Sequence, residues 1–93
     1  FPAVRRDIAV VVDVDLTVGT VIEAVRGALP TTVTEFDLFD VYQGQGVEPG
    51  KKSLAFRMLL QHTEKTLTEP EIDAAVSQVL AFLSERFNAA LRG

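Results

Sequence analysis

Cysteine is entirely absent from this chain of 93 residues. Its absence excludes a disulfide framework, a cysteine-based zinc finger and an iron–sulfur cluster. Long apolar segments are also missing, since no run approaches the roughly 20 residues that a membrane-spanning helix needs. No basic segment precedes an apolar stretch, so the pattern of a secretory signal peptide is lacking too. We therefore expect no membrane partner.

Positive charge is scarce as well. The chain has nine Lys and Arg residues and thirteen Asp and Glu residues, which gives a formal net charge of −4. A protein that grips nucleic acid mainly by neutralising phosphates needs the opposite balance. Any contact with nucleic acid must therefore rely on a local patch and on the bases.

The remaining composition is typical of a folded domain. Apolar residues make up 47% of the chain and charged residues 24%, as in ordinary globular proteins. The length fits one domain that spans residues 1–93. Because the chain begins with Phe1 rather than Met, we expect this domain to be excised from a longer protein.

Residues suited to catalysis are few. His62 is the only histidine, and its place after an apolar strand favours an exposed side chain over a metal ligand or a general base. The acidic pairs Asp13/Asp15 and Glu69/Glu71 fit loop and helix-cap positions. No set of nucleophile, base and orienting acid is indicated. The sequence therefore predicts no catalytic residue, no metal site and no cofactor in this domain.

Hydrophobic periodicity predicts four strands. A β-branched apolar run predicts the first strand over residues 7–12. Alternating apolar residues predict two further strands over 33–42 and 53–61, and residues 89–92 predict a short final one.

Two helices are predicted between these strands. Thr17 can cap the first helix, whose apolar residues recur at helical spacing until Pro30 ends it. The segment Thr68-Glu-Pro-Glu71 is a capping box with proline in the first turn, and an apolar helical stripe follows from Ile72 to Phe87. Two helices that are apolar on one side require one face of a sheet to cover. The order β-α-β-β-α-β therefore predicts an α+β fold of the ferredoxin-like split β-α-β class, a four-stranded antiparallel sheet with both helices on one face.

The loop between the second and third strands, GQGVEPGKKS, resembles a phosphate-binding loop in being rich in glycine and followed by lysine. A Walker A motif would require glycine at position 45, where Gln45 stands, and Ser or Thr at position 52, where Lys52 stands. Such a loop also joins a strand to a helix, whereas this one joins two strands. The glycines therefore predict a hairpin connection that needs their backbone freedom, and Lys51 and Lys52 can in addition meet a phosphate backbone.

Four segments of the chain resemble one known family. They are the opening FPAVRRDIAVVV, the central LFDVYQGQGVEPGKKSLAFRMLLQ, the later KTLTEPEI and the terminal AALR. Together they resemble the ferredoxin-fold anticodon-binding domain found at the C-terminus of the bacterial phenylalanyl-tRNA synthetase β subunit. The resemblance runs from about Phe1 to Arg92, and the central block is its most specific part.

The resemblance implies a function that composition does not show. The domain is expected to bind the anticodon stem-loop of tRNA(Phe) and so to support phenylalanylation of tRNA in translation. Its other partners would be the rest of the β subunit and the α subunit of a cytoplasmic (αβ)₂ synthetase, an ATP-dependent phenylalanine–tRNA ligase. The catalytic site, ATP and magnesium would belong to other domains of that enzyme.

Strand alternation predicts which residues face the side of the sheet without helices. The larger apolar residues should face the helices, so Asp7, Ala9 and Val11 point outward from the first strand. From the second and third strands the outward residues are Asp37, Phe39, Val41, Ser53, Ala55, Arg57, Leu59 and Gln61. Small residues let a flat base approach, an aromatic ring can stack on it, and a guanidinium can stack or bind phosphate.

These properties give the candidate RNA-binding residues Ala9, Phe39, Ser53, Ala55 and Arg57. A bulge near Asp40 would instead turn Phe39 into the core. Asp40 itself is expected to fix a turn or to pair with an arginine.

Four flanking cations complete the candidate set: Arg5, Arg6, Lys51 and Lys52. Arg5 and Arg6 could contact the backbone of the anticodon stem or form surface ion pairs with Asp7 or Asp40. The alternative function is a regulatory or small-ligand domain that self-associates through its open sheet face, where Val11, Val41 and Leu59 would meet a second copy.

Overall fold

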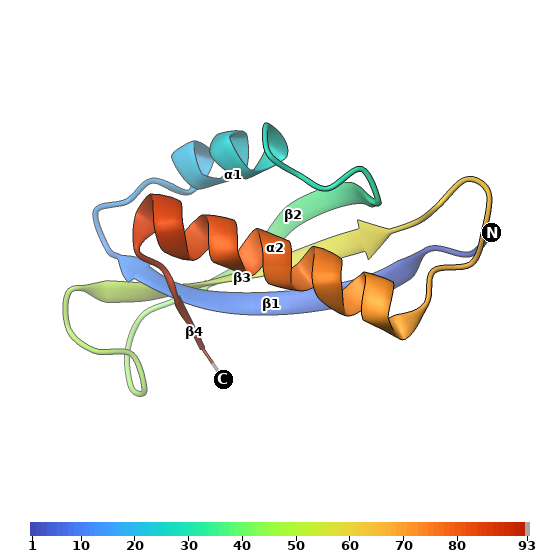
Figure 1. Ribbon diagram of the computed structural model, residues 1–93. Helices are drawn as coiled ribbons and strands as arrows, with labels where there is room; N and C mark the ends of the chain where they lie inside the picture. The colour runs from blue at the N-terminus through green and yellow to red at the C-terminus, as the bar shows by residue number, and fades with distance from the viewer. Residues whose placement is uncertain (93) are drawn as a thin grey trace.

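The protein is described by a computed structural model that covers residues 1–92, and Figure 1 shows its four strands and two helices. Gly93, the last residue of the expected domain, lies outside the described residues. The elements are β1 (Val4–Asp13), α1 (Val18–Arg26), β2 (Val33–Tyr42), β3 (Lys51–Leu60), α2 (Glu69–Phe87) and β4 (Ala90–Leu91). This order confirms the predicted ferredoxin-like α+β fold.

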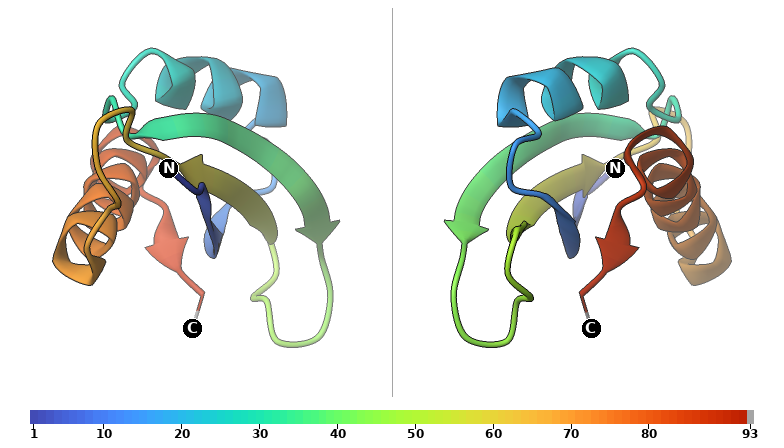
Figure 2. Two further views of the ribbon diagram at one scale, coloured as in Figure 1. Left: turned by 90° about the vertical axis from the view of Figure 1, so that its right-hand side faces the viewer. Right: turned by 90° about the vertical axis from the view of Figure 1, so that its left-hand side faces the viewer.

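The strands form one antiparallel sheet in the order β2-β3-β1-β4. The central strands β1 and β3 pair over ten residues each, whereas the edge strand β4 pairs only with Val10 and Val11. Both helices lie on the same side of the sheet, and the opposite side is left uncovered (Figure 2). We call this uncovered side the open face.

The core lies between the sheet and the helices. Every second residue of β3 from Leu54 to Leu60 is fully buried, and so are Val10 and Val12 of β1. The rings of Phe36 and Phe56 stack with their centroids 4.6 Å apart. This alternation follows from the two-residue period of a strand, which directs the large apolar side chains to one face.

The helices begin where the sequence predicts. Thr68 accepts a hydrogen bond from the backbone N–H of Glu71, and the Glu71 carboxylate accepts one from the Thr68 N–H, which completes the capping box of α2. Thr17 occupies the N-cap of α1, but its hydroxyl meets that of Thr20 at 2.6 Å and caps no backbone N–H. Helix α1 ends at Arg26, because Gly27 is a poor helix former and the following Pro30 disfavours helical backbone before it.

The glycines of the β2–β3 loop confirm its interpretation as a hairpin connection. Gly44, Gly46 and Gly50 all have positive φ angles, of 134°, 90° and 84°. Side-chain-bearing residues rarely adopt this backbone conformation. No helix in residues 1–92 is long and apolar enough to cross a membrane.

Candidate nucleic-acid interface

The register of the two central strands defines the middle of the open face. Asp7 lies opposite Arg57, Ala9 opposite Ala55, and Val11 opposite Ser53. Directly opposed residues of an antiparallel pair project to the same face, and the residues that alternate with them, Ile8, Val10, Val12, Leu54, Phe56 and Met58, belong to the buried core. The predicted facing of β1 and β3 is therefore confirmed, with Ala9 and Ala55 as a flat pair at the centre.

Phe39 lies on the open face beside Arg57. A bulge interrupts β2 between Leu38 and Asp40, as the alternative prediction required. Phe39 nevertheless remains 48% exposed, and the Arg57 guanidinium lies 4.9 Å from its ring centroid. Thus the bulge does not turn Phe39 into the core, and the guanidinium of Arg57 lies over its ring.

The same bulge makes the predicted facing of Val41 wrong. One extra residue shifts the register, so Val41 pairs with the fully buried Leu54 and projects to the helix side. Asp40 and Tyr42 take the outward positions instead, opposite Ala55 and Ser53. The apolar set expected for self-association through the open face therefore loses one of its three members.

Tyr42 and Arg92 are open-face residues that sequence reasoning missed. The Arg92 guanidinium lies 5.0 Å from the centroid of the Tyr42 ring, although β1 and β3 separate their strands. The helices and the core occupy the other side, so this contact forms across the open face. Ser53, opposite Tyr42, is only 3% exposed, which contradicts its expected accessibility as a free hydroxyl. The available signals were the bulge considered near Asp40 and the final strand predicted over residues 89–92, which includes Arg92.

Asp7 organises the cations at one end of the open face. It accepts a hydrogen bond from Arg5 at 3.1 Å, and its other oxygen lies 3.7 Å from the Arg57 Nε. The hydrogen bond from Arg5 and the positive charges of Arg5 and Arg57 hold the pKa of Asp7 below its ordinary value, against partial desolvation. The Arg57 Nε is buried and has no hydrogen-bond partner in residues 1–92.

Arg6 does not lie on the open face, where the predicted interface was placed. Its guanidinium reaches the carboxylate of Glu69 in the first turn of α2, with both oxygens at 3.3 Å. Arg5 and Arg6 thus both form surface ion pairs, the other interpretation that the sequence allowed. Arg5 lies on the open face, and Arg6 lies on the helix side.

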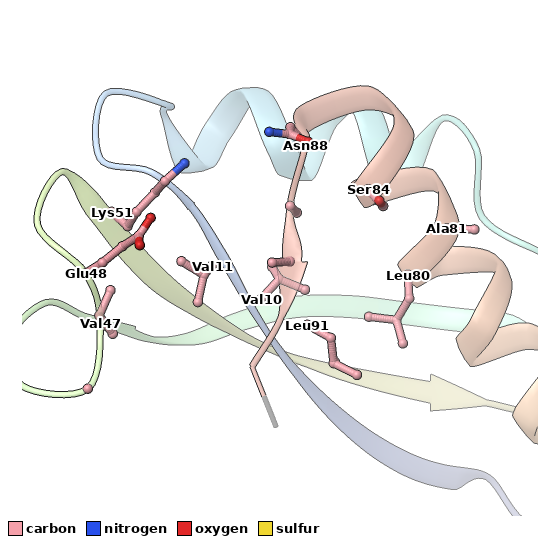
Figure 3. Close-up of a pocket in the computed structure, with 13 residues that line it drawn as sticks. Val10, Val11, Val47, Glu48, Lys51, Leu80, Ala81, Ser84, Asn88 and Leu91 are labelled. Atoms are coloured by element: carbon pink, nitrogen blue, oxygen red, sulfur yellow. The ribbon is translucent and has the colours of Figure 1, made fainter.

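The two lysines that follow the hairpin loop also differ in their contacts and in the side of the sheet that they face. Lys51 donates to Asp13 at 2.7 Å, and this hydrogen bond is the main cause that raises the pKa of Lys51. Lys51 lines an open groove of about 940 Å³ beside β4, together with Val11 and Glu48 (Figure 3). Lys52 lies opposite Val12, which places it on the helix side of the sheet.

Acidic residues limit where an anionic ligand can lie. Glu35, Asp37 and Asp40 lie opposite Leu59, Arg57 and Ala55, so they line the open face along β2. Asp37 is paired with Arg26 at 3.1 Å. A phosphate backbone is therefore favoured over β1, β3 and the end of β4 rather than over β2.

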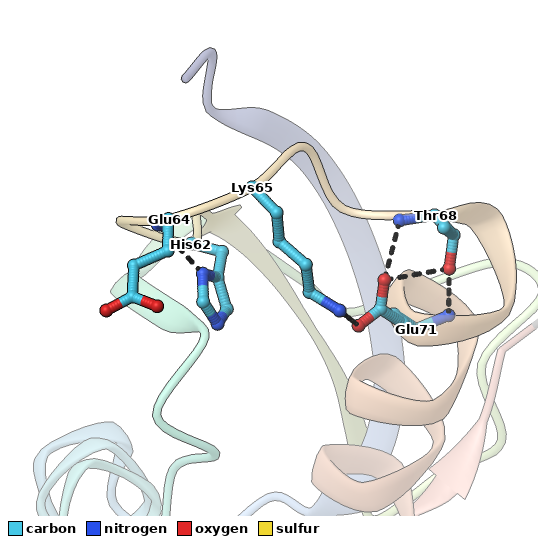
Figure 4. A network of polar contacts seen from close by, with 5 residues as sticks. All are labelled: His62, Glu64, Lys65, Thr68 and Glu71. Carbon is cyan, nitrogen blue, oxygen red and sulfur yellow. Dashed lines mark hydrogen bonds and ion pairs between the residues drawn. The ribbon is translucent and has the colours of Figure 1, made fainter.

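The loop before α2 carries a separate polar network, which Figure 4 shows. Lys65 donates a hydrogen bond to the Glu71 carboxylate, which also accepts hydrogen bonds from the backbone N–H and the hydroxyl of Thr68. The Nδ1 of His62 accepts the backbone N–H of Glu64 at 3.0 Å. Within residues 1–92 no group of three His, Cys, Asp or Glu side chains could hold a metal ion.

Comparison with known proteins matches this chain to one family. The family model of the ferredoxin-fold anticodon binding domain matches residues 1–92. The chain is similar to the proteins named phenylalanine–tRNA ligase beta subunit of Nitrosospira multiformis (51% identity), Aromatoleum aromaticum (50%) and Vibrio cholerae (51%). Each match covers 99% of this chain and 12% of the relative, so the chain spans about an eighth of their length. The chain belongs to the ferredoxin-fold anticodon binding domain family.

Proposed function

We propose that this domain binds the anticodon region of tRNA(Phe) through its open face, as part of a phenylalanine–tRNA ligase β subunit. The family and the names of the relatives support this assignment. The whole protein would work with an α subunit in an (αβ)₂ assembly that uses ATP and magnesium in other domains. This domain then contributes RNA binding rather than bond-making chemistry.

The observation that carries the proposal is the presence of two guanidinium groups over aromatic rings on the open face. Arg57 over Phe39 and Arg92 over Tyr42 lie on the open face that also holds Ala9 and Ala55. Unpaired bases of RNA loops stack on aromatic rings and guanidinium planes, and stacking on an aromatic contributes about 1–3 kcal/mol per base. Small neighbours leave room for a base to lie against the sheet.

The charge of the face supports recognition by stacking rather than by general attraction. Arg5, Arg57 and Lys51 already have carboxylate partners. Few phosphates can be neutralised, so the affinity should depend weakly on salt, with a logarithmic slope of about −1 for one or two phosphate contacts on a single strand.

An NMR titration of the domain with the anticodon stem-loop of tRNA(Phe), and with a loop of scrambled anticodon, tests the proposal. We expect shifts at Ala9, Phe39, Ala55 and Arg57 that are larger for the native loop. Phe39→Ala should weaken binding about tenfold. Phe1→Ala is the matched control, because it removes another exposed ring (62%, against 48% for Phe39) at the chain terminus. Shifts that depend on protein concentration and ignore RNA would instead support self-association.

A further inference from the structure

Arg92 is the one unpaired cation on the open face within residues 1–92. Among the residues that the structure describes, six of the nine Lys and Arg side chains lie within 4.0 Å of a carboxylate. The remaining three are Lys52, Arg86 and Arg92. Lys52 lies on the helix side of β3, and Arg86 is on α2 beside Phe87. Of the cations that the structure describes on the open face, a phosphate would therefore find Arg92 without a carboxylate partner.

The backbone and side chain of Arg92 are both held on this face. Its amide donates to the carbonyl of Ala9 at 2.9 Å, which extends the β1–β4 pairing by one residue. Its guanidinium rests over Tyr42, whose hydroxyl donates to the Gln45 carbonyl at 2.8 Å. The tyrosine ring is thus fixed to the hairpin loop, whereas the Arg92 guanidinium is connected to its anchored backbone only through a flexible side chain. Of the two partners, the guanidinium is the one that can move.

We propose that Arg92 is a nucleotide-contacting residue that exchanges Tyr42 for a phosphate when RNA binds; this inference rests on the proposed function. In the free domain the guanidinium covers the ring, and the neighbouring Ser53 is closed to solvent. A base that stacks on Tyr42 takes the place of the guanidinium, and the displaced guanidinium binds the phosphate of that nucleotide. Stacking of a base on an aromatic is stronger than an exposed cation–π contact, so the exchange is favourable.

Tyr42 offers a direct optical readout, because the chain contains one tyrosine and no tryptophan. We would titrate the domain with the anticodon stem-loop of tRNA(Phe) and follow tyrosine emission and affinity at several salt concentrations. The variants are Arg92→Ala, Arg92→Lys and Arg86→Ala. Arg86→Ala is the matched control, because it removes the same charge from an arginine beside an aromatic ring on the helix side.

The proposal predicts a distinct result for each variant. RNA should quench Tyr42 emission in the wild type, Arg92→Ala should bind about tenfold more weakly, and its salt slope should fall by about 0.7. Arg92→Lys should keep the salt slope, since it retains the charge, and should lose the guanidinium–ring contact of the free state. Arg86→Ala should match the wild type.

Three outcomes would overturn the inference or its foundation. Equal affinity and salt slope for Arg92→Ala and Arg86→Ala would show that Arg92 touches no phosphate. Tighter binding by Arg92→Ala would mean that the guanidinium only blocks the ring. If millimolar RNA caused neither quenching of Tyr42 emission nor NMR chemical-shift changes in the wild type, the proposed function itself would be refuted, whatever the role of Arg92.

Discussion

The guanidinium of Arg57 lies between Phe39 and Asp7, 4.9 Å from the ring centroid and 3.7 Å from a carboxylate oxygen. The ring offers a stacking surface, while the carboxylate holds the cation and repels an incoming phosphate. The two neighbours therefore act in opposite directions on an anionic ligand. Whether a substitution of Asp7 strengthens or weakens RNA binding therefore shows which of the two effects is larger.

Asp7→Asn should strengthen RNA binding severalfold. The variant removes a negative charge beside Arg5 and Arg57 but keeps a side chain of the same shape. Asp73→Asn is the matched control, since it makes the same charge change on the exposed side of α2. Fluorescence anisotropy with a labelled anticodon stem-loop measures both. Equal gains for the two variants would indicate a general effect of net charge, and weaker binding by Asp7→Asn would show that Asp7 positions Arg57 for the RNA.

Phe36 and Phe39 should differ sharply in their contribution to stability. Phe36 is 1% exposed and stacked on Phe56, so Phe36→Ala should lower the free energy of unfolding by about 3–5 kcal/mol. Phe39→Ala, on the open face, should cost below about 1 kcal/mol. Urea denaturation followed by circular dichroism measures both, with Phe36→Leu as a milder core variant in case Phe36→Ala does not fold. A similar loss at the two positions would place Phe39 in the core.

The order of elements and the facing of β1 and β3 could be predicted because their signals are local and repeated. Leu54, Phe56 and Met58 alternate without interruption, and each is fully buried. The capping box at Thr68 is explicit in four consecutive residues. Such patterns need no knowledge of distant parts of the chain.

The remaining features of the candidate site depend on geometry that alternation does not encode. A bulge adds one residue to β2 at Phe39, so the later residues of β2 face the opposite side from the one that alternation predicts. Val41 therefore faces the helix side, and Tyr42 faces the open face. Arg6 pairs with Glu69, 63 residues away in the chain. Arg92 meets Tyr42 across two intervening strands. Ion pairs and cation–π contacts of this kind follow from tertiary structure.

Glu71→Gln should remove stability at neutral pH and should make little difference near pH 2. The hydrogen bond from Lys65, with those from Thr68, lowers the pKa of Glu71 from 4.5 to about 2. The unfolded chain therefore takes up this proton first, so the stabilisation is complete above about pH 4.5 and is lost as the pH falls toward 2. Urea unfolding at a series of pH values compares the wild type and the variant. Curves that stayed equally far apart down to pH 2 would contradict this assignment.

Gly50→Ala and Gly19→Ala should change stability in opposite directions. A methyl group at either position meets no heavy atom within 4 Å, so crowding contributes to neither effect. Gly50 has a φ of 84°, and alanine there should cost about 1–2 kcal/mol of backbone strain. Gly19 lies in the first turn of α1, where alanine should stabilise by about 0.5 kcal/mol because it restricts the unfolded chain. Thermal unfolding of the two variants measures the difference. If Gly50→Ala were neutral, the hairpin would tolerate an ordinary residue there, and the glycine would not be needed to set the turn that brings Lys51 to Asp13.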